Sequence, residues 1–255
     1  QECEELGVNV PRKCRRCQQC PSCVISEDGR SIQEQQELDF MRQSLRYDPE
    51  KKQVTISYPV KGDPKKFKDN FHQVVRMSES LWRSLSRRNM LDSYHTQVKD
   101  YIARGVWVET SLEEVQSWKD AGNPVHYVSH HGVLNSHSST TPLRLVVNSA
   151  LKNCYTGPSL NDYYGTGPNG INNLFTVLIR WRSYEFSLVY DVSKAYHSVH
   201  TGKPEFFMRL IVWKFEEDEV WRVWGHDCMG MGDPGAMNGL EAVSYTHLTL
   251  PTTEA

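Results

Sequence analysis

The segment Ser183–His200, with the sequence SYEFSLVYDVSKAYHSVH, constrains the fold more than any other part of this chain. Apolar and polar side chains alternate up to Asp191, and this period of two predicts a buried strand that ends on a carboxylate. After Asp191 the apolar spacing becomes that of one helix face, which brings Tyr196 just beyond the acid. A carboxylate at a strand end can hold a metal ion for phosphoryl transfer, whereas an Asp before a helix is more often an N-cap. This segment alone favours the cap.

Composition limits the class of protein. The chain has 255 residues, enough for one large domain or two small ones with a real core. Its formal net charge is −2, so no overall positive field indicates a nucleic-acid partner. Positive charge is local, in runs that either lie on solvated faces or contact phosphates: Arg12–Arg16, Lys61–Lys68 and Arg83–Arg88. No apolar run approaches the length of a membrane span, so we expect no membrane partner.

The cysteines are unevenly distributed. Four of them form a CxxCxxCxxC run: Cys14, Cys17, Cys20 and Cys23. Thiols packed this closely suit a soft metal better than a disulfide framework, and they indicate a reducing compartment. Zinc is the first candidate and an iron–sulfur cluster the second, although the spacing matches neither cleanly. Reduced cysteines without a metal are the alternative.

Local patterns predict the order of helices and strands. Capping boxes at Ser31 with Glu34 and at Ser111 with Glu114 predict two helix starts. Apolar periodicity predicts further helices over about 67–85, 92–105 and 169–182. Extended chain is expected over 47–63 and 206–215, and a hairpin from strands over 124–129 and 143–148. Residues 157–170 read as an ordered loop, and 229–235 as a glycine-rich turn before a short helix.

Five segments carry motifs in a fixed order: TTPLRLVVNSALKN (140–153), SLNDYYGTGP (159–168), YDVSKAYHSV (190–199), MRLIVWKF (208–215) and MGDPGA (231–236). Together they resemble the reverse transcriptase region of the polyprotein of BEL/Pao-type LTR retrotransposons. The cysteine run PRKCRRCQQCPSC (11–23) also resembles the linker that precedes the polymerase there. The resemblance covers most of the chain, from Tyr58 to about Ala242, and it favours the metal-binding interpretation of Asp191.

The resemblance implies an α+β fold. It consists of reverse-transcriptase-like fingers and an incomplete palm, preceded by helices and a Cys-rich arm. The corresponding division is a Cys-rich basic linker over 1–30, a helix and connector over 31–57, fingers and partial palm over 58–241, and a non-native tail over 242–255.

The resemblance also implies a nucleotide site. Asp191 is similar to the first palm carboxylate, which with the backbone carbonyl of Val192 helps to hold two Mg²⁺ ions. Two ions suit in-line displacement because they neutralise both the attacking and the leaving oxygen. Tyr196 matches the steric gate that excludes a 2′-hydroxyl, and Arg144 the fingers arginine that pairs with triphosphate oxygens. Taken alone, Tyr196 could equally pack on its helix and Arg144 could face solvent.

The glycine-rich turn completes the implied site. Gly232, Asp233 and Pro234 match a turn near the template and the incoming base, although the sequence departs there from the usual arginine–proline order of the family. The implied partners are an RNA template, a DNA primer strand, deoxynucleoside triphosphates and other segments of the parent polyprotein. The implied location is a cytoplasmic retroelement particle that enters the nucleus for integration.

One expected feature is missing from the sequence. No Y-x-D-D carboxylate pair follows Asp191, and the last residues, VSYTHLTLPTTEA, resemble a translated sequencing adapter. We therefore expect this chain to be a fragment of an RNA-directed DNA polymerase that does not itself polymerise DNA. The alternative is a non-enzymatic module in which the cysteine run binds Zn²⁺ and the basic runs bind single-stranded nucleic acid.

Overall fold

The computed structural model describes residues 31–63, 66–134, 143–167, 174–188, 191–217 and 219–248. The predicted Cys-rich linker over 1–30, with Cys14, Cys17, Cys20 and Cys23, lies outside these ranges. The described part is a mixed α+β structure with small sheets, as predicted. None of its helices is long and apolar enough to cross a lipid bilayer.

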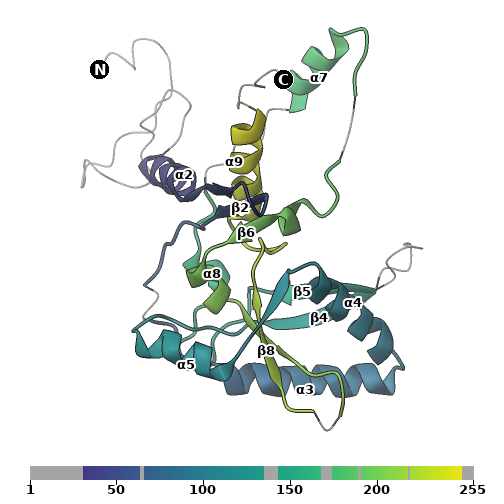
Figure 1. The fold of residues 1–255 in the computed structure, drawn as a ribbon. Helices are drawn as coiled ribbons and strands as arrows, with labels where there is room; N and C mark the ends of the chain where they lie inside the picture. The colour runs from purple at the N-terminus through teal and green to yellow at the C-terminus, as the bar shows by residue number, and fades with distance from the viewer. Residues whose placement is uncertain are drawn as a thin grey trace.

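One three-stranded sheet lies in the upper part of the molecule (Figure 1). It joins β1 (Arg46–Asp48) antiparallel to β2 (Gln53–Ile56), and β2 parallel to β6 (Val199–Thr201). The predicted alternation at Val54 and Ile56 is confirmed, since both side chains are buried. Helix α2 (Ile32–Ser44) begins at the predicted capping box, in which the backbone N–H of Ser31 donates to Glu34 at 2.7 Å.

A second sheet and a hairpin form the lower part (Figure 1). The sheet contains β3 (Trp107–Thr110), β8 (Arg222–His226) and β7 (Leu210–Trp213) in antiparallel order. Strands β4 (Ser129–Leu134) and β5 (Leu143–Asn148) make the hairpin. Helix α3 (Phe71–Arg87) contacts β4 and β7, and α4 (Leu91–Ala103) contacts β5.

Helix ends follow the sequence closely. Gly105 ends α4 with a φ of +69°, and the N–H of Val106 bonds to the carbonyl of Tyr101 at 2.9 Å. This bond and the one from Gly105 to Ile102 form a Schellman motif. Helix α5 (Leu112–Asp120) begins at Ser111, as predicted. A continuous helix, α9 (Ala236–Leu248), runs through residue 242, where the sequence suggested a boundary.

The first strand of the predicted hairpin is misplaced by five residues. Residues 126–128 run beside the start of β7 instead, with the N–H of Val128 donating to the carbonyl of Leu210 at 2.8 Å. Pairing with β5 begins only at Ser129. The extended chain predicted over 206–215 also begins as a helix, α8 (Lys203–Phe207). A one-turn helix, α6 (Leu160–Tyr163), lies in the predicted loop and is capped by Ser159.

The core is aromatic. Trp107, Trp213, Tyr58 and Tyr94 are each at most 1% exposed and belong to one cluster that extends through both parts of the molecule. Burying a large apolar side chain contributes about 1.5–3 kcal/mol, so this shared cluster holds the two parts together.

Candidate functional site

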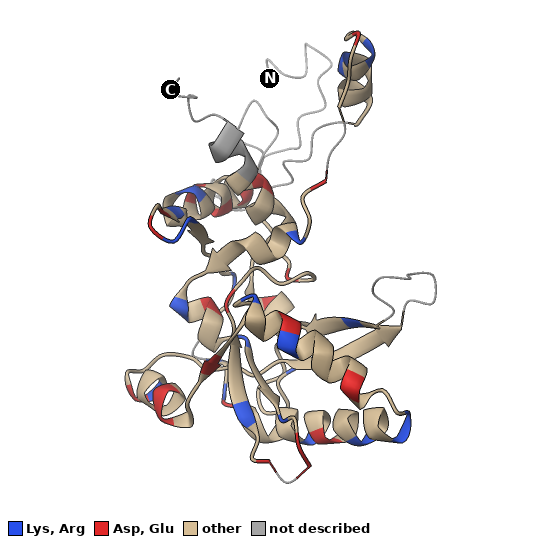
Figure 2. Ribbon diagram, turned by 45° about the vertical axis from the view of Figure 1, so that its right-hand side comes forward, with Lys and Arg blue, Asp and Glu red and all other residues tan. Residues whose placement is uncertain are grey.

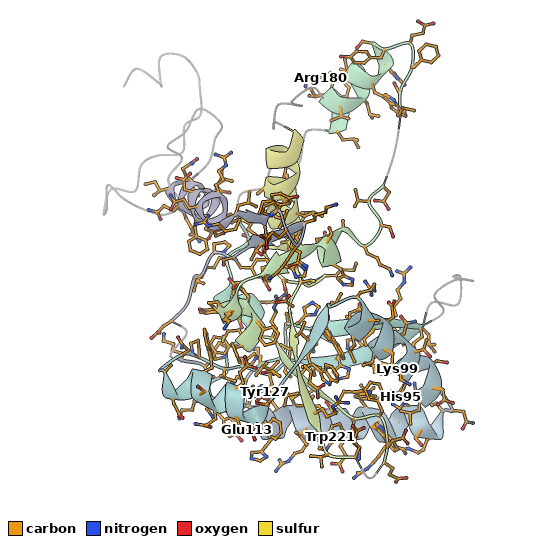
Figure 3. All side chains as sticks on the ribbon, in the orientation of Figure 1. His95, Lys99, Glu113, Tyr127, Arg180 and Trp221 are labelled. Atoms are coloured by element: carbon orange, nitrogen blue, oxygen red, sulfur yellow. The ribbon has the colours of Figure 1, made fainter. Side chains whose placement is uncertain are left out.

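The segment before Asp191 is not a strand in its described part. Residues 183–188 are turn and irregular chain, and the exposed fractions of Phe186 and Leu188 are 83% and 92%. The prediction of a buried strand over 183–191 is therefore wrong for residues 183–188. Within the described ranges, no strand pairs with this segment. The segment instead follows helix α7 (Leu174–Arg182), which stands clear of the body with Arg180 (Figures 1 and 3).

Asp191 is exposed and does not cap a helix. The helix predicted after it is a single 3₁₀ turn, η2 (Ala195–Ser198), whose N-cap is Lys194 in the left-handed region with a φ of +55°. Val192 beside it is 58% exposed. Within the described ranges the Asp191 carboxylate makes no hydrogen bond or ion pair, and no group of three or more His, Cys, Asp or Glu side chains there could hold a metal. Asp191 and Val192 are therefore both accessible to solvent.

Tyr196 lies on the 3₁₀ turn η2 and is half-buried against the main core cluster. The turn is fixed to α4 by a 2.9 Å hydrogen bond between Arg104 and His197 and by a 3.9 Å ion pair between Lys194 and Asp100. Tyr196 therefore packs on the core while part of its side chain stays exposed.

Arg144 lies on β5 opposite Val133 and faces solvent. Its neighbours Leu143 and Leu145 point inward, at 4% and 6% exposure, so burial alternates over 143–145, whereas residues 146–148 are all half-buried. The arrangement places Arg144 on an accessible face. In the described part of the chain, no contact joins it to Asp191.

The third predicted group, at Gly232–Pro234, surrounds a buried ion pair. Nη1 of Arg209 lies 2.8 Å from Oδ2 of Asp233, and the two side chains are 0% and 1% exposed. The same Oδ2 accepts hydrogen bonds at 3.1 Å from the Tyr58 hydroxyl and from the Gly230 N–H. Oδ1 accepts the hydroxyl of Ser149, which directly follows β5. We call Arg209, Asp233, Tyr58, Ser149 and Gly230 the Asp233 cluster.

Electrostatics keep the Asp233 cluster ionic. Burial by itself would lower the pKa of Arg209, but Asp233 and the nearby tyrosines raise it, so the guanidinium stays charged. Burial and the charge of Asp233 raise the pKa of Tyr58 well above its ordinary value, so its hydroxyl remains a donor. Tyr164, whose ring lies 5.1 Å from that of Tyr58, has its pKa raised in the same way by burial.

The Asp233 carboxylate is buried and bonded within the cluster, so Asp233 belongs to the predicted turn as a residue that holds it in place. The turn Gly230–Asp233 closes with a 3.0 Å bond from the Asp233 N–H to the Gly230 carbonyl, and Gly232 has a φ of +105°. This is the geometry of a type II turn, which favours Gly at its third position. Its tip is Met231, which is 72% exposed. One signal in the sequence could have revealed the cluster. Arg209 stands directly before the apolar run of β7, and an arginine that is buried there needs an acidic partner.

Two other polar or hollow regions lie outside the predicted site. His200 Nδ1 and Asp227 Oδ2 are 2.8 Å apart, and this bond raises the pKa of His200 to about 10. A pocket of about 570 Å³ lies where α4 ends over β3 and β8, with Trp107 and Trp224 among its lining residues. The pocket includes none of the predicted site residues.

Basic and acidic residues interleave along the helices in Figure 2.

Comparison with models of protein families and with curated proteins finds no match for this chain.

Proposed function

We propose that this chain is the fingers and part of the palm of an RNA-directed DNA polymerase from a BEL/Pao-type retrotransposon polyprotein. In this proposal it binds an RNA template, a DNA primer strand and a deoxynucleoside triphosphate. Arg144 contacts the triphosphate, Tyr196 lies beside the sugar, and Asp191 with the Val192 carbonyl supplies part of a two-Mg²⁺ site.

One observation carries the proposal: four of the five motif segments meet at one buried point. Ser149 comes from 140–153, Tyr164 from 159–168, Arg209 from 208–215 and Asp233 from 231–236. The segments are far apart in sequence, and each contributes a polar side chain to the Asp233 cluster or its border. Motifs that converge in this way belong to one folded unit, which supports reading them together. Tyr196, from the remaining motif, packs on the core cluster that also contains Tyr58 and Tyr164.

The metal part of the proposal is incomplete in this chain. Asp191 supplies one carboxylate, and a two-ion site that clamps both reacting oxygens needs further acidic ligands. The described residues do not complete such a site. The proposed activity of the chain as it stands is binding without extension of the primer.

Binding of nucleotide on top of primer–template tests the proposal. The chain is first bound to a fluorescent DNA primer annealed to an RNA template. Fluorescence anisotropy then follows the dissociation of this primer–template from the chain. The measurement is made with Mg²⁺ and either a complementary or a non-complementary deoxynucleotide. We expect the complementary nucleotide to slow dissociation. Arg144→Ala removes a charge-assisted contact of about 1.5–3 kcal/mol. It should therefore reduce the slowing of dissociation by the nucleotide about tenfold or more, while binding of the primer–template without nucleotide stays unchanged.

Arg76→Ala is the matched control, because Arg76 is exposed on α3 and lies outside all five motifs. It should leave the nucleotide effect unchanged. No binding of the primer–template, or equal effects of the two arginine variants, would contradict the proposal. Binding that depends on stoichiometric zinc and is lost in Cys14→Ser with Cys17→Ser would favour the zinc- and nucleic-acid-binding module instead.

A further inference from the structure

The pocket at the end of α4 has the size and the lining of a small-molecule site. Its volume of about 570 Å³ lies within the range of about 300–1,000 Å³ that is typical of such sites. Three aromatic side chains line it, from β3, from β8 and from the loop after β7: Trp107, Trp224 and Phe215. Ile102 and Ala103 of α4 complete the apolar part. This lining favours a ligand with a flat apolar body.

The charged residues of the pocket are one acid and two cations: Glu109, Arg222 and Lys99. The acid is already paired, since Nε of Arg222 donates to Glu109 at 2.7 Å, and Nη1 of Arg222 lies 3.7 Å from Oε1 of Glu219. Lys99 is exposed on α4 (Figure 3), and its Nζ lies 5.5 Å from the centre of the Phe215 ring. Among the described residues, Lys99 makes no ion pair. Lys99 is therefore the cation that a ligand can pair with.

Two indole groups of the pocket wall lack an acceptor. The Nε1 atoms of Trp107 and Trp224 are buried and have no hydrogen-bond partner among the described residues. An unsatisfied buried donor costs free energy, and a ligand oxygen recovers part of that cost once a small shift of the ring brings the two into contact. The one carboxylate of the lining is occupied by Arg222. A ligand that complements this lining therefore carries acceptor oxygens and a negative charge.

We propose that this pocket binds a small aromatic carboxylate. The aromatic body lies among Trp107, Trp224 and Phe215, and the carboxylate pairs with Lys99. The pocket contains none of the residues of the proposed nucleotide site, so this inference does not rest on the proposed function.

Binding of 2-naphthoate and of its neutral analogue 2-naphthamide to the full chain tests the inference. The two probes share one ring system and differ in charge. Binding is followed by NMR through the assigned indole N–H signals of the tryptophans. We expect naphthoate to bind about three- to fivefold more tightly than naphthamide, which is the gain that a partly exposed ion pair gives. Both probes should shift the signals of Trp107 and Trp224.

Lys99→Met tests the charge, because methionine keeps most of the length of the lysine stem and removes its positive charge. It should abolish the preference for naphthoate and leave the affinity for naphthamide unchanged. Lys203→Met is the matched control, since Lys203 is exposed on α8 and lies outside the pocket, and this variant should keep the preference. Ala103→Leu adds bulk inside the pocket and should weaken the binding of both probes. Because Lys99 and Ala103 are exposed, neither substitution should change the melting temperature.

The outcomes separate the charge from the site. Equal affinities of the two probes, or a preference that persists in Lys99→Met, would overturn the contact with the carboxylate. Absence of binding, shifts confined to tryptophans other than Trp107 and Trp224, or unchanged binding by Ala103→Leu would overturn the site itself. The proposed function stands in each of these cases, because no nucleic acid takes part in the measurement.

Discussion

Replacing Asp233 by Asn should destabilise the chain more than any change to its exposed ion pairs. The substitution keeps the size of the side chain but leaves the Arg209 charge buried without its counter-charge, at 0% exposure. It also turns a carboxylate that accepts from Tyr58, Ser149 and Gly230 into an amide with a single acceptor.

The expected magnitude follows from burial. Removing one partner of a buried ion pair costs about 3–5 kcal/mol, because the remaining charge cannot regain its hydration. With an m-value of about 3 kcal/mol/M in urea, the unfolding midpoint should fall by about 1–2 M. A loss of this size still leaves a folded majority if the free energy of unfolding lies in the upper part of the usual range of about 5–15 kcal/mol.

Urea unfolding followed by tryptophan fluorescence measures this shift, and the chain has seven tryptophans to report it. Glu109→Gln is the control. It breaks an ion pair with Arg222 in which the side chains are 46% and 40% exposed, and such pairs contribute at most about 1 kcal/mol. The reasoning is refuted if the two variants shift the midpoint equally.

Three further predictions concern packing, pH and the surface. Gly225→Ala would bring a Cβ within 2.1 Å of the Phe206 ring. Such overpacking costs about 1–3 kcal/mol, so the melting temperature measured by circular dichroism should fall by several degrees. An unchanged melting temperature would contradict this close contact. Burial lowers the pKa of His126 to about 4, so the stability it contributes is complete above its ordinary pKa of 6.5 and is lost as the pH falls towards 4. The bond to Asp227 raises the pKa of His200 to about 10, so the stability that His200 contributes is complete below pH 6.5 and is lost as the pH rises towards 10. The urea midpoint measured from pH 5 to 9 should therefore peak near neutrality. His200→Gln should remove the fall of the midpoint on the alkaline side. Leu188, at 92% exposure, should promote self-association, so Leu188→Ser should reduce light scattering without changing the melting temperature; equal scattering would argue against an exposed apolar segment.

Sequence patterns predicted the local features of the fold well. The helix starts predicted at Ser31 and Ser111 are correct, because each depends on hydrogen bonds within a few residues. The full capping box is present at Ser31. At Ser111 only the serine side chain caps the helix, and the Glu114 carboxylate accepts from the Thr110 hydroxyl instead. The strand predicted over 143–148 is also correct and corresponds to β5.

Features that depend on distant neighbours were predicted less well. Alternation over 183–188 indicates a strand only if another strand pairs with it, and a local pattern does not specify that partner. Residues 126–128 pair with the start of β7 rather than within the predicted hairpin. The ion pair of the Asp233 cluster joins residues 24 positions apart, and its bond to Tyr58 spans 175, so no local pattern contains it.

Cross-linking of the bound template tests the central claim most directly, namely that the motif-bearing segments form one nucleic-acid site. An RNA template carrying 4-thiouridine in its single-stranded part, annealed to a DNA primer, is bound to the chain, irradiated and mapped by mass spectrometry. We predict cross-links to Met231 at the tip of the turn and to the solvent-facing side of β5 near Arg144. Cross-links confined to the cysteine-rich residues 1–30 would contradict the claim.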